Sequence, residues 1–151
     1  MSAYGMGTLF RRKETHRMRT LHIEASVGKL SEVLCFADEI MDAADVGMKT
    51  RMQISLALEE LFVNVAQYAY KDRSGSVTIE AGMQGDRFTV VLSDLGIPYN
   101  PLEHKDPDIT QSADERPVGG LGIFMVRKTM DTFEYRYEDG KNVTTIQKIV
   151  G

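Results

Sequence analysis

The segment Thr50–Tyr70 is the sequence feature that most constrains how this chain can fold. Its apolar residues recur at steps of three and four, which is the spacing of one face of an α-helix. This stripe consists of Ile54, Leu58, Leu61, Val65 and Tyr68. The pattern predicts a long helix whose apolar stripe faces a core.

Two polar residues, Glu60 and Asn64, lie beside this stripe and one helical turn apart. A spacing of four places both on one helix face, at the edge of the core, with their side chains pointing into the same space. A desolvated charge without a partner is costly, so a carboxylate at such a position needs a reason. The helix alone leaves two interpretations open: a functional pair, or surface groups bonded to water or a neighbouring loop.

Composition indicates one globular domain without a membrane span. The chain has 151 residues, of which 42% are hydrophobic and 26% charged, and its net charge is −4. This length suits a single core, and the charge gives no field that would attract nucleic acid. No stretch approaches the length of a membrane span, and the N-terminus lacks the apolar region of a secretory signal. We therefore expect a cytoplasmic protein that binds neither nucleic acid nor membrane.

The chain has one cysteine and three histidines. Cys35 lies within an apolar helical pattern, so we expect it to be a small buried hydrophobic residue, and a disulfide within the chain is excluded. The histidines are scattered, and no spacing of cysteine and histidine indicates a zinc site.

The remaining patterns predict the order β-α-α-β-β-loop-α-β-β. Alternating strands are expected at Arg19–Ala25, around Val77–Ala81 and Phe88–Leu92 with a turn at Gly85–Asp86, at Thr132–Glu138 and at Asn142–Val150. Helices are expected at Val27–Ala44 with Ser26 as its cap, at Thr50–Tyr70, and after Gly119–Gly122. The sequence thus predicts an α+β fold, a two-layer sandwich in which helices cover one face of a mostly antiparallel, mixed sheet.

Two segments lack such periodicity. Residues 1–18 hold glycines and a basic cluster and are expected to form a flexible tail, which leaves residues 19–151 as the folded domain. The stretch Gly96–Gly120 contains all four prolines of the chain. A loop of this length in a compact domain is typically functional, and we expect a lid over a site.

Two further motifs could carry chemistry. Asp94-Leu95-Gly96 places a carboxylate at a strand end, followed by a residue that lets another group approach the backbone closely. Gly119–Gly122 leads into a helix whose exposed N–H groups could hold an anion. Each motif alone could be an ordinary turn or loop end. Together with Glu60 and Asn64 they would permit a magnesium–nucleotide site, although these residue types do not identify the nucleotide as ATP.

These segments together resemble a known family. Ala57–Tyr70, Asp94–Pro98 and Gly119–Ile123 are similar, in order and spacing, to the N, G1 and G2 boxes of the GHKL ATPases. Among these ATPases, the chain most resembles the anti-sigma factor serine/threonine kinases. The resemblance extends from about Leu21 to Ile149. It implies a Bergerat-type ATP-binding fold for the domain.

The resemblance also implies roles for individual residues. Asn64 would coordinate Mg²⁺, Asp94 would bond the adenine amino group, and Gly96 would pass beside the base. Backbone groups for the phosphates would come from Gly120, Leu121 and Gly122. Glu60 would be the general base that deprotonates a protein serine or threonine hydroxyl.

The chain departs from the family pattern at two places. Tyr68 stands one turn after Asn64, where many relatives carry histidine, and Gln67 precedes it. Pro98 occupies a position where the broader superfamily often has a second glycine.

By resemblance, the chain would be a kinase that binds Mg-ATP and phosphorylates a small anti-sigma factor antagonist of the STAS type in a partner-switching system. It would act as a homodimer and could also bind a sigma factor. The main alternative is an ATP-dependent protein-binding regulator without phosphotransfer. The catalytic domain of a histidine kinase is less favoured, because no dimerisation helix with a phosphoacceptor histidine is expected ahead of the domain. An α+β domain that binds no nucleotide remains open.

Overall fold

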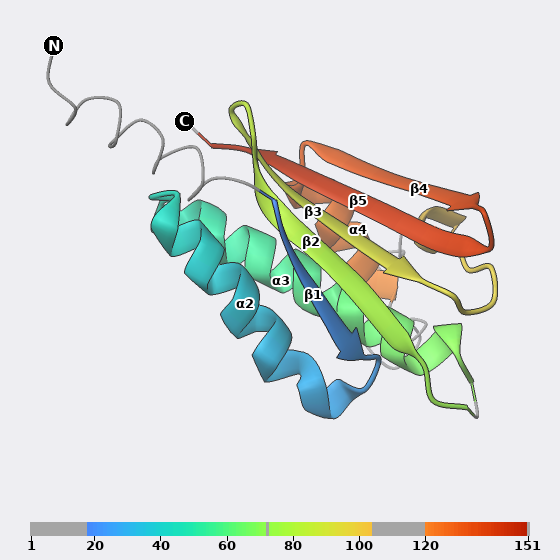
Figure 1. Cartoon of the computed structure of the whole chain (residues 1–151). Coiled ribbons are helices and arrows are strands. Elements are labelled where there is room, and N and C mark those ends of the chain that lie inside the picture. Colours follow the sequence, from blue (N-terminus) through green and yellow to red (C-terminus); the bar gives the residue numbers. More distant parts are fainter. Residues whose placement is uncertain (1–17, 72, 104–119, 151) are drawn as a thin grey trace, which may run out of the picture.

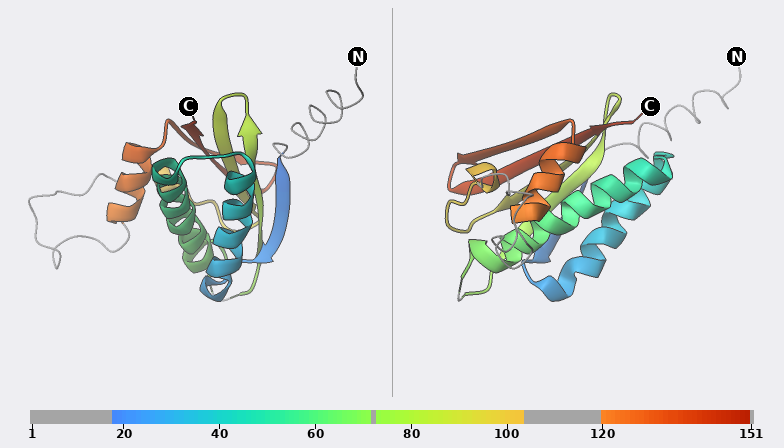
Figure 2. Two further views of the ribbon diagram at one scale, coloured as in Figure 1. Left: turned by 90° about the vertical axis from the view of Figure 1, so that its left-hand side faces the viewer. Right: turned by 180° about the vertical axis from the view of Figure 1, so that it is seen from behind.

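A computed structural model describes residues 18–71, 73–103 and 120–150 (Figure 1). These residues form two layers, a sheet and a set of helices that covers one of its faces (Figures 1 and 2). The described strands form one five-stranded sheet in the order β1-β2-β3-β5-β4, and each neighbouring pair is antiparallel. The predicted α+β sandwich is confirmed, and no parallel pair occurs among these strands.

The order of elements matches the prediction. The strands are β1 (Arg19–Glu24), β2 (Ser76–Gln84), β3 (Arg87–Asp94), β4 (Thr132–Glu138) and β5 (Lys141–Ile149). The α-helices are α2 (Leu30–Ala43), α3 (Met48–Asn64) and α4 (Gly120–Thr129). Shorter helical turns are η1 (Val27–Lys29), η2 (Val65–Ala69) and η3 (Pro101–Glu103).

The central hairpin follows from alternation in the sequence. Strands β2 and β3 pair along their length from Val77↔Asp94 to Gln84↔Arg87, and Gly85 takes a positive φ of 62° in the turn between them. Because successive side chains point to opposite faces, alternate residues of both strands are buried under the helices. These residues are Val77, Ile79, Ala81, Phe88, Val90 and Leu92.

Helix α3 lies at the centre of the helical layer, with α2 on one side and α4 on the other (Figure 2). Its residues Ile54, Leu58 and Leu61 from the predicted stripe are all buried, and Phe62 beside them is fully buried. The helix therefore contributes core residues to contacts with the sheet and with both neighbouring helices.

The predicted apolar stripe of the long helix is wrong at its last residue, Tyr68. The α-helix ends at Asn64, and the chain continues as the π turn Val65–Ala69, which has a wider backbone period. This change of period turns Tyr68 out to 38% exposure, while Ala69 and Tyr70 are buried instead. A stripe extended at 3.6 residues per turn cannot follow such a turn.

The start of the first helix also differs from the prediction. Val27–Lys29 form a 3₁₀ turn before α2, and the side chain of Ser26 makes no capping hydrogen bond. The backbone carbonyl of Ser26 instead accepts the N–H of Lys29 at 2.9 Å. The carbonyl of Ser26, rather than its hydroxyl, thus closes the first turn.

Cys35 is exposed, so its predicted burial is wrong. The core face of α2 is formed by Val33, Ala37, Ile40 and Met41. Cys35 is two residues from both Val33 and Ala37, and at about 100° per residue this places it on the opposite side of the helix.

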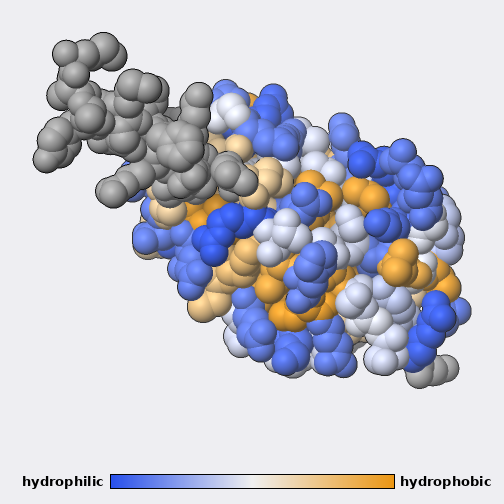
Figure 3. Space-filling view, viewed as in Figure 1, coloured by the Kyte–Doolittle hydropathy of each residue, from blue (hydrophilic) through white to orange (hydrophobic). Residues whose placement is uncertain are grey.

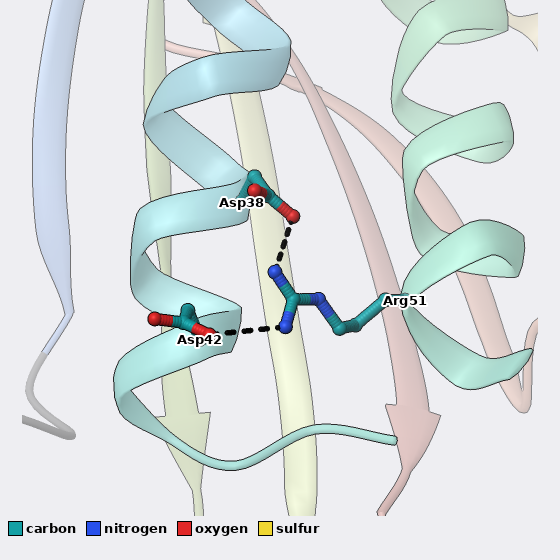
Figure 4. Close-up of polar contacts among 3 residues, drawn as sticks. All are labelled: Asp38, Asp42 and Arg51. Carbon is teal, nitrogen blue, oxygen red and sulfur yellow. Dashed lines mark hydrogen bonds and ion pairs between the residues drawn. The ribbon is translucent and has the colours of Figure 1, made fainter. Parts of the chain in front are cut away.

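An ion-pair cluster links α2 to α3 across their solvent-facing side (Figure 4). The guanidinium of Arg51 donates to Asp38 at 2.6 Å and to Asp42 at 3.2 Å. The hydrogen bond with Asp38 is the main reason that the pKa of Arg51 is raised, although burial opposes it. Both carboxylates are well exposed, so this cluster orients the two helices more than it stabilises them.

Parts of the prediction lie outside the described residues. These are the N-terminal tail up to residue 17 and the segment 104–119 of the expected lid. Within the described residues, no helix is both long and apolar enough to cross a membrane. Hydrophilic and hydrophobic residues are interspersed on the face shown in Figure 3.

Two leucines of α3 test the role of this helix in the core. Leu58 is fully buried, whereas Leu56 on the same helix is 62% exposed. We expect Leu58→Ala to lower the free energy of unfolding by about 2–5 kcal/mol, because it leaves a cavity in the core. The matched control Leu56→Ala should change it by less than about 0.5 kcal/mol. Urea denaturation measures both, and equal losses would contradict the described orientation of α3.

Candidate functional site

A pocket lies where the end of α3, the end of β3 and the start of β5 meet. Apolar side chains form part of its wall, among them Leu61, Val65, Leu92 and Pro101. Its polar lining consists of Asn64, Asp94, Tyr99, Asn142 and Thr144. An apolar cleft with a few convergent polar groups is the usual form of a small-molecule site. The fold thus brings Asn64 and Asp94, thirty positions apart in the sequence, to one place.

Asp94 is the last residue of β3 and is only 6% exposed. Its Oδ1 accepts the backbone N–H of Gly96 and an amide N–H of Asn142, both at 2.9 Å. Burial raises the pKa of this carboxyl group, and the two hydrogen bonds partly oppose that rise. Its Oδ2 accepts no hydrogen bond from the described part of the chain, so it is available to an amine or other donor.

Gly96 lies directly against the π turn. A Cβ atom at this position would overlap the backbone carbonyl of Ala69, and the next residue, Ile97, donates its N–H to the same carbonyl at 2.9 Å. The sequence predicts a close approach to the backbone here, and the structure contains one. The group that approaches is the protein's own π turn, so glycine is needed for the loop to pass.

Asn64 ends α3 and is 7% exposed. Its Nδ2 has no hydrogen-bond partner among the described residues. A buried polar group without a partner costs about 1–3 kcal/mol, so its presence indicates that something else binds there. Rotation of the amide by a half turn would offer the pocket an oxygen instead, which is a ligand that Mg²⁺ accepts.

Glu60 lies one turn before Asn64, half buried, and contacts the start of α4. A Cβ atom at Gly122 would overlap the Glu60 carboxyl group, so the backbone of Gly122 is packed against that group. Burial raises the pKa of Glu60, and the neighbouring carboxylate of Glu59 adds to the rise. A carboxylate with a raised pKa is a better proton acceptor than an exposed one.

The structure therefore places the predicted residues as two adjoining groups. Asn64, Asp94 and Gly96 surround the pocket or lie beside it, and Glu60 faces the glycine-rich first turn of α4. That first turn contains the other predicted residues, Gly120, Leu121 and Gly122. Helix α3 connects the two groups, because it carries both Glu60 and Asn64.

Sequence reasoning missed the pocket residues on β5. Asn142 and Thr144 are 4% and 9% exposed and pair across the sheet with Asp94 and Leu92. They alternate with the same period as buried Ile146, so the sequence contained a signal: two polar residues on the core face of a strand. Buried polar side chains of this kind need partners.

Two tyrosines stack at the rim of the pocket. The rings of Tyr68, from the π turn, and Tyr99, from the loop after β3, lie 5.4 Å apart at an angle of 18°. Burial raises the pKa of Tyr99, and the neighbouring Tyr68 and Glu60 add to the rise. The residue that departs from the family pattern, Tyr68, thus stacks on a ring that lines the pocket and does not point into the core.

A family model and several curated sequences are similar to this chain. The family model described as "Histidine kinase-like ATPase domain" matches residues 23–148. The chain is 29% identical over 94 residues to the serine-protein kinase RsbW of Bacillus mycoides (strain KBAB4) and 30% identical to that of Bacillus cereus (strain ATCC 10987 / NRS 248). Each alignment covers 60% of this chain, and the chain spans 59% of the length of these curated relatives.

Comparison with solved structures concerns the fold alone. The RsbU and RsbW domains of Rv1364c from Mycobacterium tuberculosis match with a TM-score of 0.61 at 17% identity, over 87% of this chain and 32% of that one. The histidine kinase AdeS of Acinetobacter baumannii matches with a TM-score of 0.50 at 13% identity, over 98% of this chain and 80% of that one. Both matches show that the fold is shared.

Gly96 and Gly47 provide a matched test of the close approach. We expect Gly96→Ala to lower the free energy of unfolding by about 1–3 kcal/mol, because its methyl group would collide with rigid backbone. At Gly47 nothing lies within 4 Å of the added atom and φ is −64°. Gly47 is the N-cap of α3, where alanine is less favoured than glycine, so Gly47→Ala should cost less than about 1 kcal/mol. Urea denaturation of both variants decides, and an unaffected Gly96→Ala would contradict the packing of the loop on the π turn.

The raised pKa of Asp94 predicts a pH dependence of stability. An acid whose pKa is higher in the folded than in the unfolded state stabilises the fold below its ordinary value of 3.8. That contribution is lost as the pH rises through the folded pKa. We expect parent and Asp94→Asn to differ progressively as the pH rises above about 4, with the variant gaining relative stability. Measuring the free energy of unfolding of both proteins across this pH range tests the prediction. A difference between them that does not change with pH would show that burial does not raise the pKa of Asp94.

Proposed function

Because the chain belongs to the histidine kinase-like ATPase domain family, we propose that it is a serine/threonine protein kinase that binds Mg-ATP and phosphorylates a small STAS-type antagonist protein. The observation that carries this proposal is a pocket lined by both Asp94 and Asn64, next to a half-buried carboxylate at a glycine-rich helix start. Within the described residues, Asn64 Nδ2 has no hydrogen-bond partner and both hydrogen bonds to Asp94 go to Oδ1. The similarity to serine-protein kinases supports the same reading.

The chemistry of the residues present suits a nucleotide. The free Oδ2 of Asp94 would accept a hydrogen bond from the adenine amino group, while its Oδ1 stays bonded to Gly96 and Asn142. The apolar walls, including Leu92 and Pro101, would enclose the base. A carboxylate that is already buried and oriented loses little freedom when it binds such a group.

The same residues fit a magnesium ion that arrives with the nucleotide. Asn64 would turn its amide oxygen toward the ion, which would give the buried amide a partner. No group of three histidine, cysteine, aspartate or glutamate side chains in the described part of the chain could hold a metal ion. Asn64 would then share the ion with phosphate oxygens, as is usual for Mg²⁺.

Glu60 would accept the proton of the substrate hydroxyl. Its burial and its neighbour Glu59 raise its pKa toward the range in which a general base works well. Backbone N–H groups of Gly120, Leu121 and Gly122, at the N-terminus of α4, would hold phosphate oxygens. Bound Mg-ATP would supply the phosphoryl group and the metal charge that offsets the negative charge of the transfer.

The remaining parts of the proposal rest on the resemblance of the sequence motifs to the anti-sigma factor kinases. A partner-switching protein would bind its antagonist substrate or a sigma factor, as a homodimer in the cytoplasm. Residues 19–151 would form its kinase domain. The curated relatives are named serine-protein kinases, and this chain matches them over part of their length.

Glu60→Gln separates phosphotransfer from binding. The glutamine keeps the shape and hydrogen bonding of Glu60 but cannot accept the proton. We expect ATP affinity to stay within a few-fold of the parent and phosphotransfer to fall by about 10²–10⁴. Calorimetry gives the affinity, and transfer of labelled phosphate from ATP to STAS-type antagonist proteins of the source organism gives the rate.

The neighbouring Glu59→Gln is the matched control. It removes one carboxylate from the same helix and should leave the rate within about tenfold, because Glu59 acts on Glu60 only through its charge. A parent that binds ATP and its partner tightly but never transfers phosphate would favour the binding regulator without kinase activity. Loss of ATP binding in Glu60→Gln would place Glu60 among the ligands of the nucleotide or metal.

A further inference from the structure

The pocket side chain Asn142 makes hydrogen bonds to several segments of the described chain. It is the second residue of β5, is 4% exposed, and lies opposite Asp94 in the sheet register. Its Nδ2 donates to Asp94 Oδ1 at 2.9 Å, to the carbonyl of Ile97 at 2.8 Å and, more weakly, to the carbonyl of Gly96 at 3.4 Å. All three acceptors belong to the segment that leaves β3.

The oxygen of the same amide binds two donors. Asn142 Oδ1 accepts the backbone N–H of Tyr99 at 3.0 Å and a short hydrogen bond from the hydroxyl of Tyr135. Tyr99 is part of the loop after β3, and Tyr135 lies on β4. One side chain thus fixes both ends of the loop 94–99 and connects it to the edge strand of the sheet.

These partners leave only one orientation for the amide. Carboxylate and carbonyl oxygens can only accept, so they require the NH₂ side, and a backbone N–H can only donate, so it requires the oxygen. A reversed amide would place acceptor against acceptor on one side and donor against donor on the other. Asn142 is therefore a rigid connection, unlike Asn64, whose NH₂ group has no partner in the described part of the chain.

The connection determines which oxygen of Asp94 remains free. Gly96 N–H and Asn142 Nδ2 both bind Oδ1, so the carboxylate is held in one rotation in which none of the described residues donates to Oδ2. Without Asn142, Oδ1 would keep one short local hydrogen bond from Gly96, and the loop would keep its contact with Ala69. The carboxylate could then turn, and the loop that carries Tyr99 would lose its connection to β5.

We infer that Asn142 is a positioning residue that gives the site its selectivity for adenine, by holding Asp94 and the loop 94–99 in the orientation that reads the amino group of the base. This role rests on the proposed ATP site and adds a residue to it. Asn142 acts through Asp94, while Asn64 and the start of α4, which belong to other elements, would bind the metal and the phosphates.

Nucleotide selectivity shows whether Asn142 orients Asp94 or only contributes to the stability of the fold. Purine riboside triphosphate lacks only the 6-amino group of ATP, so the ratio of its dissociation constant to that of ATP measures how well the amino group is read. Both ligands are titrated with Mg²⁺ into the same folded protein by calorimetry. A variant that is simply less stable would change both constants together.

We expect the parent to bind ATP about 10- to 100-fold more tightly than the analogue, as a charged hydrogen bond to the amine would give. Asn142→Ala should reduce this ratio to less than about threefold, mainly by weakening ATP. Asn142→Asp should reduce it similarly although it has the same shape, because it replaces the donor to Asp94 by a second carboxylate oxygen. Tyr135→Phe should reduce the selectivity ratio part of the way. It removes one of the two hydrogen bonds that Asn142 Oδ1 accepts and leaves the hydrogen bonds that Asn142 Nδ2 donates intact.

The matched control is Gln147→Ala. Gln147 also carries an amide on β5, but on the opposite face of the sheet, where it donates to Thr89 at 3.0 Å. Its removal should leave the selectivity ratio of the parent unchanged. If Asn142→Ala does not fold, the partial loss in Tyr135→Phe, which keeps Asn142 in place, still decides.

The outcomes distinguish the inference from the proposed function. Parental selectivity in Asn142→Ala or in Tyr135→Phe overturns the positioning role, and so does an equal loss of affinity for both nucleotides. A parent that binds both nucleotides equally shows that Asp94 does not read the amine. A parent that binds neither nucleotide overturns the ATP site itself, and the role of Asn142 falls with it.

Discussion

The contact between the π turn and the loop after β3 is the constraint on which the site depends. The carbonyl of Ala69 accepts the N–H of Ile97, and Gly96 passes against the same backbone. The helical layer and the end of the sheet meet at this point without a side chain between them. The carbonyl of Ala69 is available for this contact because the helical segment ends there, and the last carbonyls of a helix have no partner within it.

A second set of contacts is polar and comes from three parts of the chain. Tyr70, at the end of the π turn, donates its hydroxyl to the carbonyl of Ser76 and accepts the N–H of Leu95. Asn142 on β5 binds the loop from the other side. The loop is therefore held by backbone and side-chain hydrogen bonds, and these keep the buried carboxylate of Asp94 in place. The cost appears as the raised pKa of Asp94.

The sequence predicted those features that follow from local periodicity. The alternation of Val77, Ile79 and Ala81 indicated the strand and its buried face, and the spacing of Glu60 and Asn64 placed both on one side of the helix. Tyr68 was predicted wrongly because a π turn changes the helical period, and no local pattern marks where this occurs. The role of Asn142 was missed because its hydrogen-bond partners in the loop after β3 lie 43 to 48 residues before it in the sequence. Only the pairing of β3 with β5 brings them together.

The stacked tyrosines at the rim of the pocket have a spectroscopic consequence. The chain contains six tyrosines and no tryptophan. Tyr68 and Tyr99 stack on each other, and Tyr70 and Tyr135 donate hydrogen bonds around the same loop. The chain has no indole to accept the excitation energy, and these four rings are four of the six tyrosines that can give its ultraviolet emission. The protein thus carries an intrinsic optical probe of this loop, and occupancy of the pocket can be followed without attaching a dye.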